Sequence, residues 1–417
     1  MKQFLRLRSL IILVLMTCSF YVKAQITFEA QFRNRFEIRD GYTIPSEKNA
    51  VPSVMIFQRT RLSFIYDSEV LKIKISPQDV RLWGSETMRS STGLFGDEAS
   101  LELFEGYAEL KLGELGWLSA GRQQLVYDNQ RILAARNWNN NGISYDALLL
   151  KFNPKNYAIH IGSTWNSLNE SLEDNLYPSN RIKTLNFLWV NRKFDNEMNL
   201  SLLHVSSGNT ETDTTNTLNF RHTTGIYSSY KNGNLIFEGD VYYQYGRNAS
   251  GTKVSAYLIS ADLSYDLLGF TPGIGATIIS GNHYKGSGQI TDHIFDFLYG
   301  ARHRFYGNMD YFKNLTSHTA QGGLSDYYTY LNLKAIGKVT VLNTCHYFRL
   351  TQTNELTPDN KNLGFENDLV VKCKFQKWGT LEGGYLFYVP TQTINTIRGV
   401  TDSRFSQFIY MQLTILI

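Results

Sequence analysis

The chain has 417 residues, of which 41 are basic and 37 acidic, giving a net charge of +4 at neutral pH. Four of the basic residues lie within positions 1–24, so the rest carries 37 basic and 37 acidic side chains and is formally neutral. A neutral chain has no bulk attraction for nucleic acid, and no nucleic-acid partner is expected. Any preference for anions must come from local clusters of arginine.

The first 24 residues read as a secretory signal peptide. Lys2, Arg6 and Arg8 precede an apolar run at 10–16, and the small residue Ala24 supplies a cleavage site. This charged, apolar and small-residue order is typical of an export signal, and the run is too short for a transmembrane helix. We therefore expect a signal peptide at 1–24 and one exported domain at 25–417.

From position 26 onward the dominant pattern is alternation with a period of two. In residues 26–39, Ile26, Phe28 and Phe32 share one face, and polar residues such as Arg33 and Arg35 occupy the other. A soluble sheet alternates as well, but so long an unbroken polar face favours a wetted lumen opposite lipid.

Similar segments recur along the chain and predict about eighteen strands. They lie near Ile26, Val54, Leu71, Leu101, Leu118, Ile143, Tyr157, Leu185, Leu200, Leu218, Leu235, Val254, Phe270, Tyr327, Val339, Leu363, Leu381 and Phe405. The predicted fold class is all-β, a transmembrane antiparallel β-barrel, because this number lies within the range of bacterial barrels.

The connections between these strands alternate strictly between short and long. Short ones occur at 67–68, 113–114 and 232–233, whereas polar stretches such as 84–100 and 129–141 are long. Outer-membrane barrels have short periplasmic turns and long extracellular loops. The pattern therefore predicts the bacterial outer membrane as the location and lipid as the surrounding partner.

The last strand runs to the end of the chain. Ile409, Met411, Leu413, Ile415 and Ile417 share one face. This resembles the terminal strand recognised by the barrel-insertion machinery, which is an expected partner.

One long connection, 281–323, is rich in aromatic residues that would not stay in water. We expect part of it to fold into the pore as a constriction or plug, and a surface packing cluster is the alternative. Leu203 and Val205 on a predicted lumen face also suggest that a segment packs inside. The candidate constriction residues are Phe295, Phe297, Tyr299, Phe305 and Tyr306.

Charged residues at predicted lumen positions are concentrated in the first strands. The candidate cations are Arg33, Arg35, Arg59, Arg61, Lys72, Lys74 and Arg122, and the candidate counter-charges are Glu105, Glu109 and Asp146. Neighbouring strands would place the cations on one side of the wall, where guanidinium groups suit planar carboxylates. The alternative is that these charges pair internally and only keep the pore wet.

The sequence contains no motif that predicts catalysis, a cofactor or a metal site. His160 and His346 lie on predicted strands, but neither a nucleophile elbow nor an HExxH helix accompanies them. Cys345 and Cys373 have no spacing typical of a disulfide framework or a metal site. The protein is not expected to be an enzyme, and a barrel hydrolase remains an alternative of another class.

The segment GRQQLVYDNQRILAARNWNNNGISYDALLLKF at 121–152 resembles the signature of the alginate-export family of outer-membrane barrels. The segments at 104–112, 304–312 and 363–375 are similar to other parts of that family.

This resemblance implies a monomeric eighteen-stranded barrel with an electropositive, constricted pore for anionic polysaccharide. It also implies that Arg122 and Arg131 are pore-lining cations and that Asp128 and Asp146 orient them.

The leading hypothesis is therefore a passive outer-membrane channel whose transported solute is an anionic oligo- or polysaccharide. A general diffusion porin without sugar preference is the second hypothesis, and a surface adhesin that uses the long loops is a further one.

Overall fold

The computed structural model describes residues 25–85, 101–173, 176–194, 197–283, 290–334 and 337–417. The predicted signal peptide lies outside the described residues, as do most of the 84–100 connection and the 195–196 turn. None of the helices in these ranges has the length and hydropathy needed to cross a membrane.

Eighteen strands of eight or more residues make up the described wall, which confirms the predicted fold class and strand number. They are β1 (Gln25–Asp40), β3 (Ser53–Asp67), β4 (Leu71–Leu82), β5 (Glu102–Leu112), β6 (Gly116–Gln123), β7 (Tyr145–Phe152), β8 (Tyr157–Trp165), β9 (Thr184–Phe194), β10 (Met198–Thr210), β11 (Leu218–Asn232), β12 (Leu235–Arg247), β13 (Lys253–Tyr265), β14 (Phe270–Ile279), β16 (Leu324–Lys334), β17 (Val339–Arg349), β18 (Asn362–Cys373), β19 (Gly379–Pro390) and β21 (Ser406–Leu416).

Shorter elements lie in the connections. They are β2 (Ser46–Glu47), β15 (Thr291–Asp292), β20 (Ser403–Arg404), η1 (Arg302–Arg304), α2 (Leu315–His318) and α3 (Gln392–Arg398).

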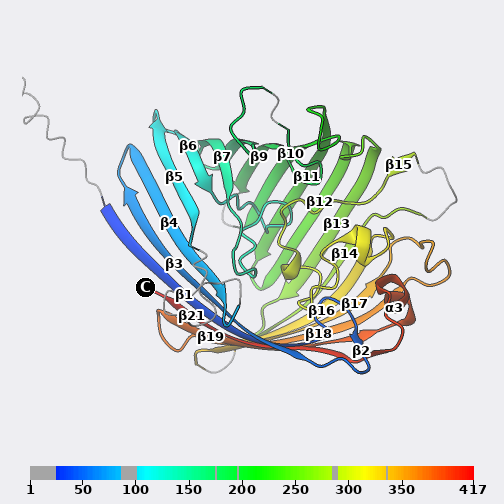
Figure 1. Cartoon of the computed structure of the whole chain (residues 1–417). Helices are drawn as coiled ribbons and strands as arrows, with labels where there is room; N and C mark the ends of the chain where they lie inside the picture. The colour runs from blue at the N-terminus through cyan, green and yellow to red at the C-terminus, as the bar shows by residue number, and fades with distance from the viewer. Residues whose placement is uncertain (1–24, 86–100, 174–175, 195–196, 284–289, 335–336) are drawn as a thin grey trace, which may run out of the picture.

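The long strands close into a barrel (Figure 1). Each pairs antiparallel with the next long strand along the chain, and β1 pairs with both β3 and the last strand, β21. Phe32, for example, faces Thr60 on one side and Ile415 on the other. Among the described strands, closure leaves no open edge of the sheet, and a closed sheet is a condition for strands that cross a lipid bilayer.

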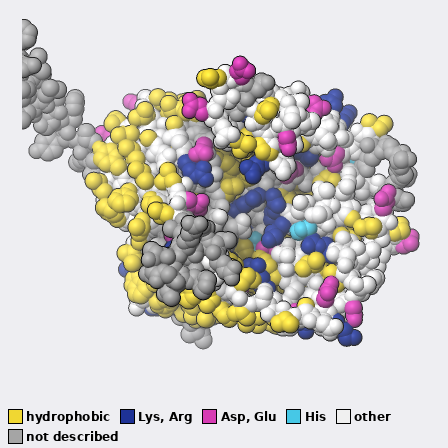
Figure 2. All heavy atoms as spheres, in the orientation of Figure 1, with side chains coloured by type: hydrophobic (Ala, Val, Ile, Leu, Met, Phe, Trp, Pro, Cys, Tyr) yellow, Lys and Arg dark blue, Asp and Glu magenta, His cyan; other side chains and the backbone are white. Residues whose placement is uncertain are grey.

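The two faces of the wall differ as the alternation predicts. On β12, Val241 and Tyr243 are exposed on the outside, whereas Tyr242 and Gln244 are buried inside. Figure 2 shows apolar side chains gathered on the outer surface along the left and lower edges of the molecule. The outer face is therefore suited to lipid and the inner face to a polar or packed interior.

The connections separate by length between the two ends of the barrel. The β11–β12 turn has two residues, and its Gly233 has a φ of 56°, as tight hairpin turns require. The connections at the opposite end are longer and include 124–144 and 280–323. We call the long-loop end the outer end, since long loops are extracellular in such barrels.

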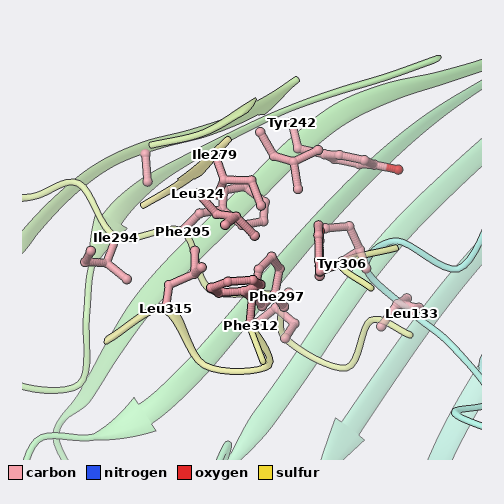
Figure 3. Packing of buried hydrophobic residues seen from close by; sticks show 14 of the residues in the cluster. Leu133, Tyr242, Ile279, Ile294, Phe295, Phe297, Tyr306, Phe312, Leu315 and Leu324 are labelled. Atoms are coloured by element: carbon pink, nitrogen blue, oxygen red, sulfur yellow. The ribbon is translucent and has the colours of Figure 1, made fainter. Parts of the chain in front are cut away.

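Two outer-end connections fold into the barrel (Figure 1). Residues 290–323 bring Phe295, Phe297 and Phe312 into a buried cluster, where Figure 3 shows them against the inner face of the wall. Leu203 and Val205 on β10 belong to the same cluster.

The other inward connection, 124–144, contains the stretch 129–141, which the sequence predicts to be a polar outer loop, and this prediction is wrong. Leu125, Ile132 and Leu133 within it are fully buried in the interior cluster. Burying these apolar side chains inside the barrel is more favourable than leaving them in water, and it draws the polar residues between them inward.

Candidate pore constriction

A cationic cavity of about 280 Å³ lies where the tips of the two inward connections meet. Its lining includes Arg136 from 124–144, and Arg302, Arg304 and Lys313 from 290–323. Figure 2 shows basic side chains gathered in the hollow at the centre of the viewed face. Because both connections fold into the lumen, this cavity is the candidate constriction of the pore.

The guanidinium groups of Arg136 and Arg302 are held by backbone carbonyls. Arg136 Nη2 donates to the carbonyl oxygen of Leu298 at 2.8 Å, and Arg302 Nη1 donates to that of Lys313 at 2.5 Å. Burial, together with neighbouring Arg302, lowers the pKa of Arg136 to about 10, and burial also lowers the pKa of Arg302. Arg136 is therefore still charged at neutral pH.

Among the arginines and the lysine of this lining, Lys313 alone pairs with a described carboxylate, that of Asp310. Within the part of the chain that the structure describes, no ion pair involves Arg136, Arg302 or Arg304. A carbonyl satisfies a guanidinium donor without neutralising its charge, so the cavity keeps a net positive field.

Asp310 fixes one side of the cavity. It accepts hydrogen bonds from Tyr42 and from Lys313 Nζ at 3.1 Å, and it lies 3.1 Å from His303 Nδ1. Burial alone would raise the pKa of Asp310, but His303, Lys313 and Tyr42 lower it to about 2. His303 also stacks on Trp138, with ring centroids 3.9 Å apart, so Asp310 joins the two inward connections.

Arg33, Arg35 and Arg59 lie on the lumen face of β1 and β3, beneath the 124–144 connection. Arg33 Nη2 donates to the carbonyl oxygen of Asn139 at 3.1 Å, and Arg59 Nη1 donates to that of Asn140 at 3.1 Å. Arg35 forms an ion pair with Glu37 at 2.6 Å, and its guanidinium lies 4.1 Å from the ring of Trp138. These arginines thus hold the connection in place, whereas they were expected to line an open wall.

The other candidate charges of the first strands, Arg61, Lys72, Lys74, Glu105 and Glu109, lie on the lumen face. Arg61 Nη2 donates to Gln78 at 2.7 Å, and Lys74 pairs with Glu105 at 2.7 Å. Lys72 pairs with Asp67 at 3.7 Å, and Glu109 pairs with Lys151 at 2.5 Å. The internal pairing that was left open as an alternative therefore applies to Lys72 and Lys74.

Arg122 and Asp146 lie on the outer face of the wall, which corrects the prediction that they line the pore. They face each other across β6 and β7 with an ion pair of 3.1 Å. On β7, Asp146 shares the exposed face with Leu148, while Tyr145 and Ala147 point inward and are buried.

Arg131 is buried inside the barrel and does not line an open pore. Its Nε lies 3.4 Å from Asp240 Oδ2 on β12, and its Nη2 donates to Ser260 Oγ on β13 at 2.8 Å. Its guanidinium carbon lies 3.6 Å from the ring centre of Phe305. Arg131 therefore ties both inward connections to the wall, because 124–144 supplies the arginine and 290–323 supplies the ring.

The family resemblance implies that Asp128 orients a pore-lining arginine, but Asp128 forms no ion pair with Arg131. Its Oδ1 accepts a hydrogen bond from Trp189 Nε1 at 2.9 Å, and burial raises its pKa.

The aromatic residues of 290–323 stabilise the connection from within and do not line the cationic cavity. Phe295, Phe297 and Tyr306 are buried in the interior cluster, and Tyr299 and Phe305 pack against it. Sequence reasoning missed the cavity cations, although the run RHR at 302–304 within an apolar connection was a signal for them.

His160 and His346, the two histidines considered as candidate bases, lie on the lumen face. His160 contacts Tyr127, with Nδ1 and the hydroxyl oxygen 3.1 Å apart, and His346 Nδ1 lies 3.0 Å from Asp326. No serine or cysteine within the described ranges forms a hydrogen bond with either ring. In the described part of the chain, neither His160 nor His346 therefore has beside it the serine or cysteine that a serine or cysteine hydrolase uses as its nucleophile.

Comparison with known proteins agrees with this architecture. A family model described as alginate export matches residues 24–405. No curated protein matches the sequence.

Several solved structures have the same fold. OpdK of Pseudomonas aeruginosa, solved with vanillate, has a TM-score of 0.64 at 12% identity over 95% of this chain and 98% of that one. OccAB1 of Acinetobacter baumannii has a TM-score of 0.63 at 12% identity, covering 96% and 98% of the two chains. OccAB4 of the same organism has a TM-score of 0.62 at 15% identity, covering 94% and 98%. Taken with the match over nearly the whole sequence, this protein belongs to the alginate-export family of bacterial outer-membrane β-barrels.

Proposed function

We propose that this outer-membrane channel passes anionic oligo- or polysaccharides by passive diffusion. The observation that carries the proposal is the set of arginines at the candidate constriction, Arg136, Arg302 and Arg304, whose charges have no ion-pair partner among the described residues. Fixed charge in a narrow, low-dielectric passage concentrates solutes of the opposite sign.

The chemistry of these cations favours carboxylates. A guanidinium group is planar and presents donors in a fixed fork that matches a carboxylate with two parallel hydrogen bonds. Here some donors are already bound to carbonyl oxygens, as in Arg136 and Arg302, so a passing solute meets partly satisfied cations. Partial satisfaction keeps each binding step weak, and a channel needs weak binding for the solute to leave again.

A swelling assay with proteoliposomes tests the proposal. Oligosaccharides of uronic acids and uncharged oligosaccharides of the same length would be compared in vesicles that contain the mature protein. We expect faster swelling with the uronates, at a ratio that falls as salt screens the constriction. Equal rates for the two sugars at low salt would favour the general diffusion porin instead.

A further inference from the structure

A second cavity, of about 630 Å³, lies at the outer end of β10, β11 and β12. Hydroxyl, amide and charged side chains dominate its lining, among them Asn180, Asn209, Arg221, Arg247 and Asn248. Its volume lies within the range of small-molecule binding sites. Nothing in the proposed transport step through the cationic cavity uses this second space.

The floor of this cavity is a fixed hydrogen-bond network centred on Asp292. Asp292 Oδ2 lies 3.4 Å from Arg221 Nη2 and accepts a hydrogen bond from Asn248 Nδ2 at 3.0 Å. Arg221 also donates to the carbonyl oxygen of Ile294 at 2.9 Å. The polar groups therefore have set orientations before any ligand arrives, which lowers the entropic cost of binding.

The rim offers both donors and acceptors. Asn209 donates through Nδ2 to the carbonyl oxygens of Ser179 and Arg181, at 3.1 and 2.8 Å. These two hydrogen bonds fix the orientation of the Asn209 side chain. The exposed Arg247 donates to the carbonyl oxygen of Gly251 at 2.6 Å, and its guanidinium group has five N–H donors in all. Sugar hydroxyl groups both donate and accept, so such a mixed rim is complementary to them.

The formal charges of this lining cancel, unlike those of the constriction. Arg221 and Arg247 are matched by Asp292 and Asp296, whereas the cationic cavity has no acidic residue in its lining. A site without net charge has no reason to select an anion. Its chemistry suits the uncharged hydroxyl groups that all sugar rings share.

The two cavities flank the same inward connection. Asp296 lines the polar cavity, and Gly300, four positions later, lines the cationic cavity. Likewise, Lys313 lines the cationic cavity, and Thr316, three positions later, lines the polar cavity. A sugar bound in the polar cavity would thus be close to the cations of the constriction.

We propose that the polar cavity is a saccharide subsite that binds the hydroxyl groups of pyranose rings, charged or uncharged. The proposal rests on the proposed function, because it takes the transported solute to be a saccharide. The constriction selects for charge, and the outer subsite recognises the sugar ring.

Blockade of single-channel current by maltohexaose, an uncharged oligosaccharide, tests this subsite. Added on the long-loop side, maltohexaose should produce resolved blockades in the wild-type channel. Asn209→Leu combined with Asn248→Leu should weaken this binding about tenfold or more, because two sugar hydrogen bonds are lost. Asn180→Trp fills the exposed rim with less disturbance of the Asp292 network and should also remove the blockades.

Two control variants make the result specific. Thr214→Trp adds the same bulk on the neighbouring 211–217 connection outside the cavity lining and should leave the blockades unchanged. Arg302→Ser should keep the blockades while it lowers anion selectivity.

The outcomes separate the two proposals. If maltohexaose gives no blockades, or gives blockades that Asn180→Trp leaves intact, the subsite is refuted even when anion selectivity persists. If blockades depend on the cavity but the channel shows no anion selectivity, the subsite stands and the proposed selectivity fails.

Discussion

Arg302 is the residue whose charge most directly tests the constriction. Its guanidinium group donates to two backbone carbonyls and forms no ion pair with a described residue. One unit charge about 6 Å from a passing carboxylate contributes about 0.7 kcal/mol even in water, or roughly a threefold change in relative permeability. We therefore expect Arg302→Ser to lower the anion-to-cation permeability ratio by about that factor in planar bilayers.

Arg122→Ser is the matched control for this prediction. It removes one arginine as well, but from the outer face, where Arg122 pairs with Asp146. Selectivity should not change in this variant. A larger loss of selectivity with Arg122→Ser than with Arg302→Ser would contradict the assigned positions.

The lowered pKa of Asp310 predicts that single-channel conductance depends on pH. Its native pKa of about 2 lies below the ordinary value of 3.8, so the ionised form is the one stabilised in the folded protein. This stabilisation, about 2 kcal/mol, is complete above pH 4 and is lost as the pH falls through about 2. Single-channel conductance should therefore rise or become noisier between pH 4 and pH 2, as the inward connections loosen.

Asp310→Asn checks the origin of that change. The amide has no charge to lose, so the variant should already show the loosened conductance at pH 6 and little further change down to pH 2. If Asp310→Asn showed the same conductance change between pH 4 and pH 2 as the wild type, the change would have to come from other carboxylates.

Arg131 is predicted to matter for stability more than for transport. Both Arg131 and its partner Asp240 are almost fully buried, so Arg131→Met would leave a buried carboxylate without its cation. Such a loss costs about 3–5 kcal/mol. Urea unfolding of the refolded protein should show this decrease, and Arg131→Met with Asp240→Leu should recover much of it. Equal stability of the single and double variants would argue against the ion pair.

The connection 280–323, whose residues 290–323 fold inward, is not needed to close the wall. β14 and β16 pair directly, from Phe270 opposite Leu333 to Ile279 opposite Leu324. Because Ile279 and Leu324 face each other, a short Asn-Gly hairpin could replace the connection. We expect this variant to insert as a barrel with conductance several-fold above wild type. A correctly folded variant with unchanged conductance would show that the connection does not narrow the pore.

At the level of elements, the strands could be predicted from the sequence, whereas the inward folding of the long connections could be predicted only in part. Period-two alternation is set locally by each strand, so all eighteen long strands were located to within a few residues. Phe295 and Phe312 pointed to an inward 281–323 connection, whereas the apolar run at 132–134 was overlooked among polar neighbours.

The errors at single residues have physical causes. Arg122 has the same parity as Leu118 and Ala120 on β6, so the sequence carried the signal that places it outside. Arg131 could not be placed from sequence, because its partners Asp240 and Ser260 lie more than one hundred positions away. The cationic cavity could not be predicted from the sequence either, because it forms where two connections far apart in sequence meet inside the barrel.

For the whole molecule, the formal neutrality of residues 25–417 and the cationic constriction are compatible. The selective field depends on where unpaired charges lie, and some acidic residues of the lumen wall are bound to cations of the same wall, as Glu105 is to Lys74 and Glu109 is to Lys151. Net charge alone would therefore predict no selectivity, while the distribution of charge predicts a preference for anions.

The reversal potential of refolded residues 25–417 in a planar bilayer, measured across a tenfold KCl gradient, tests that preference most directly. An anion-selective constriction predicts a potential with the sign of chloride permeation, which shrinks in Arg302→Ser and is retained in Arg122→Ser. A potential near zero, or one with the sign of potassium permeation, would contradict an anion-selective constriction.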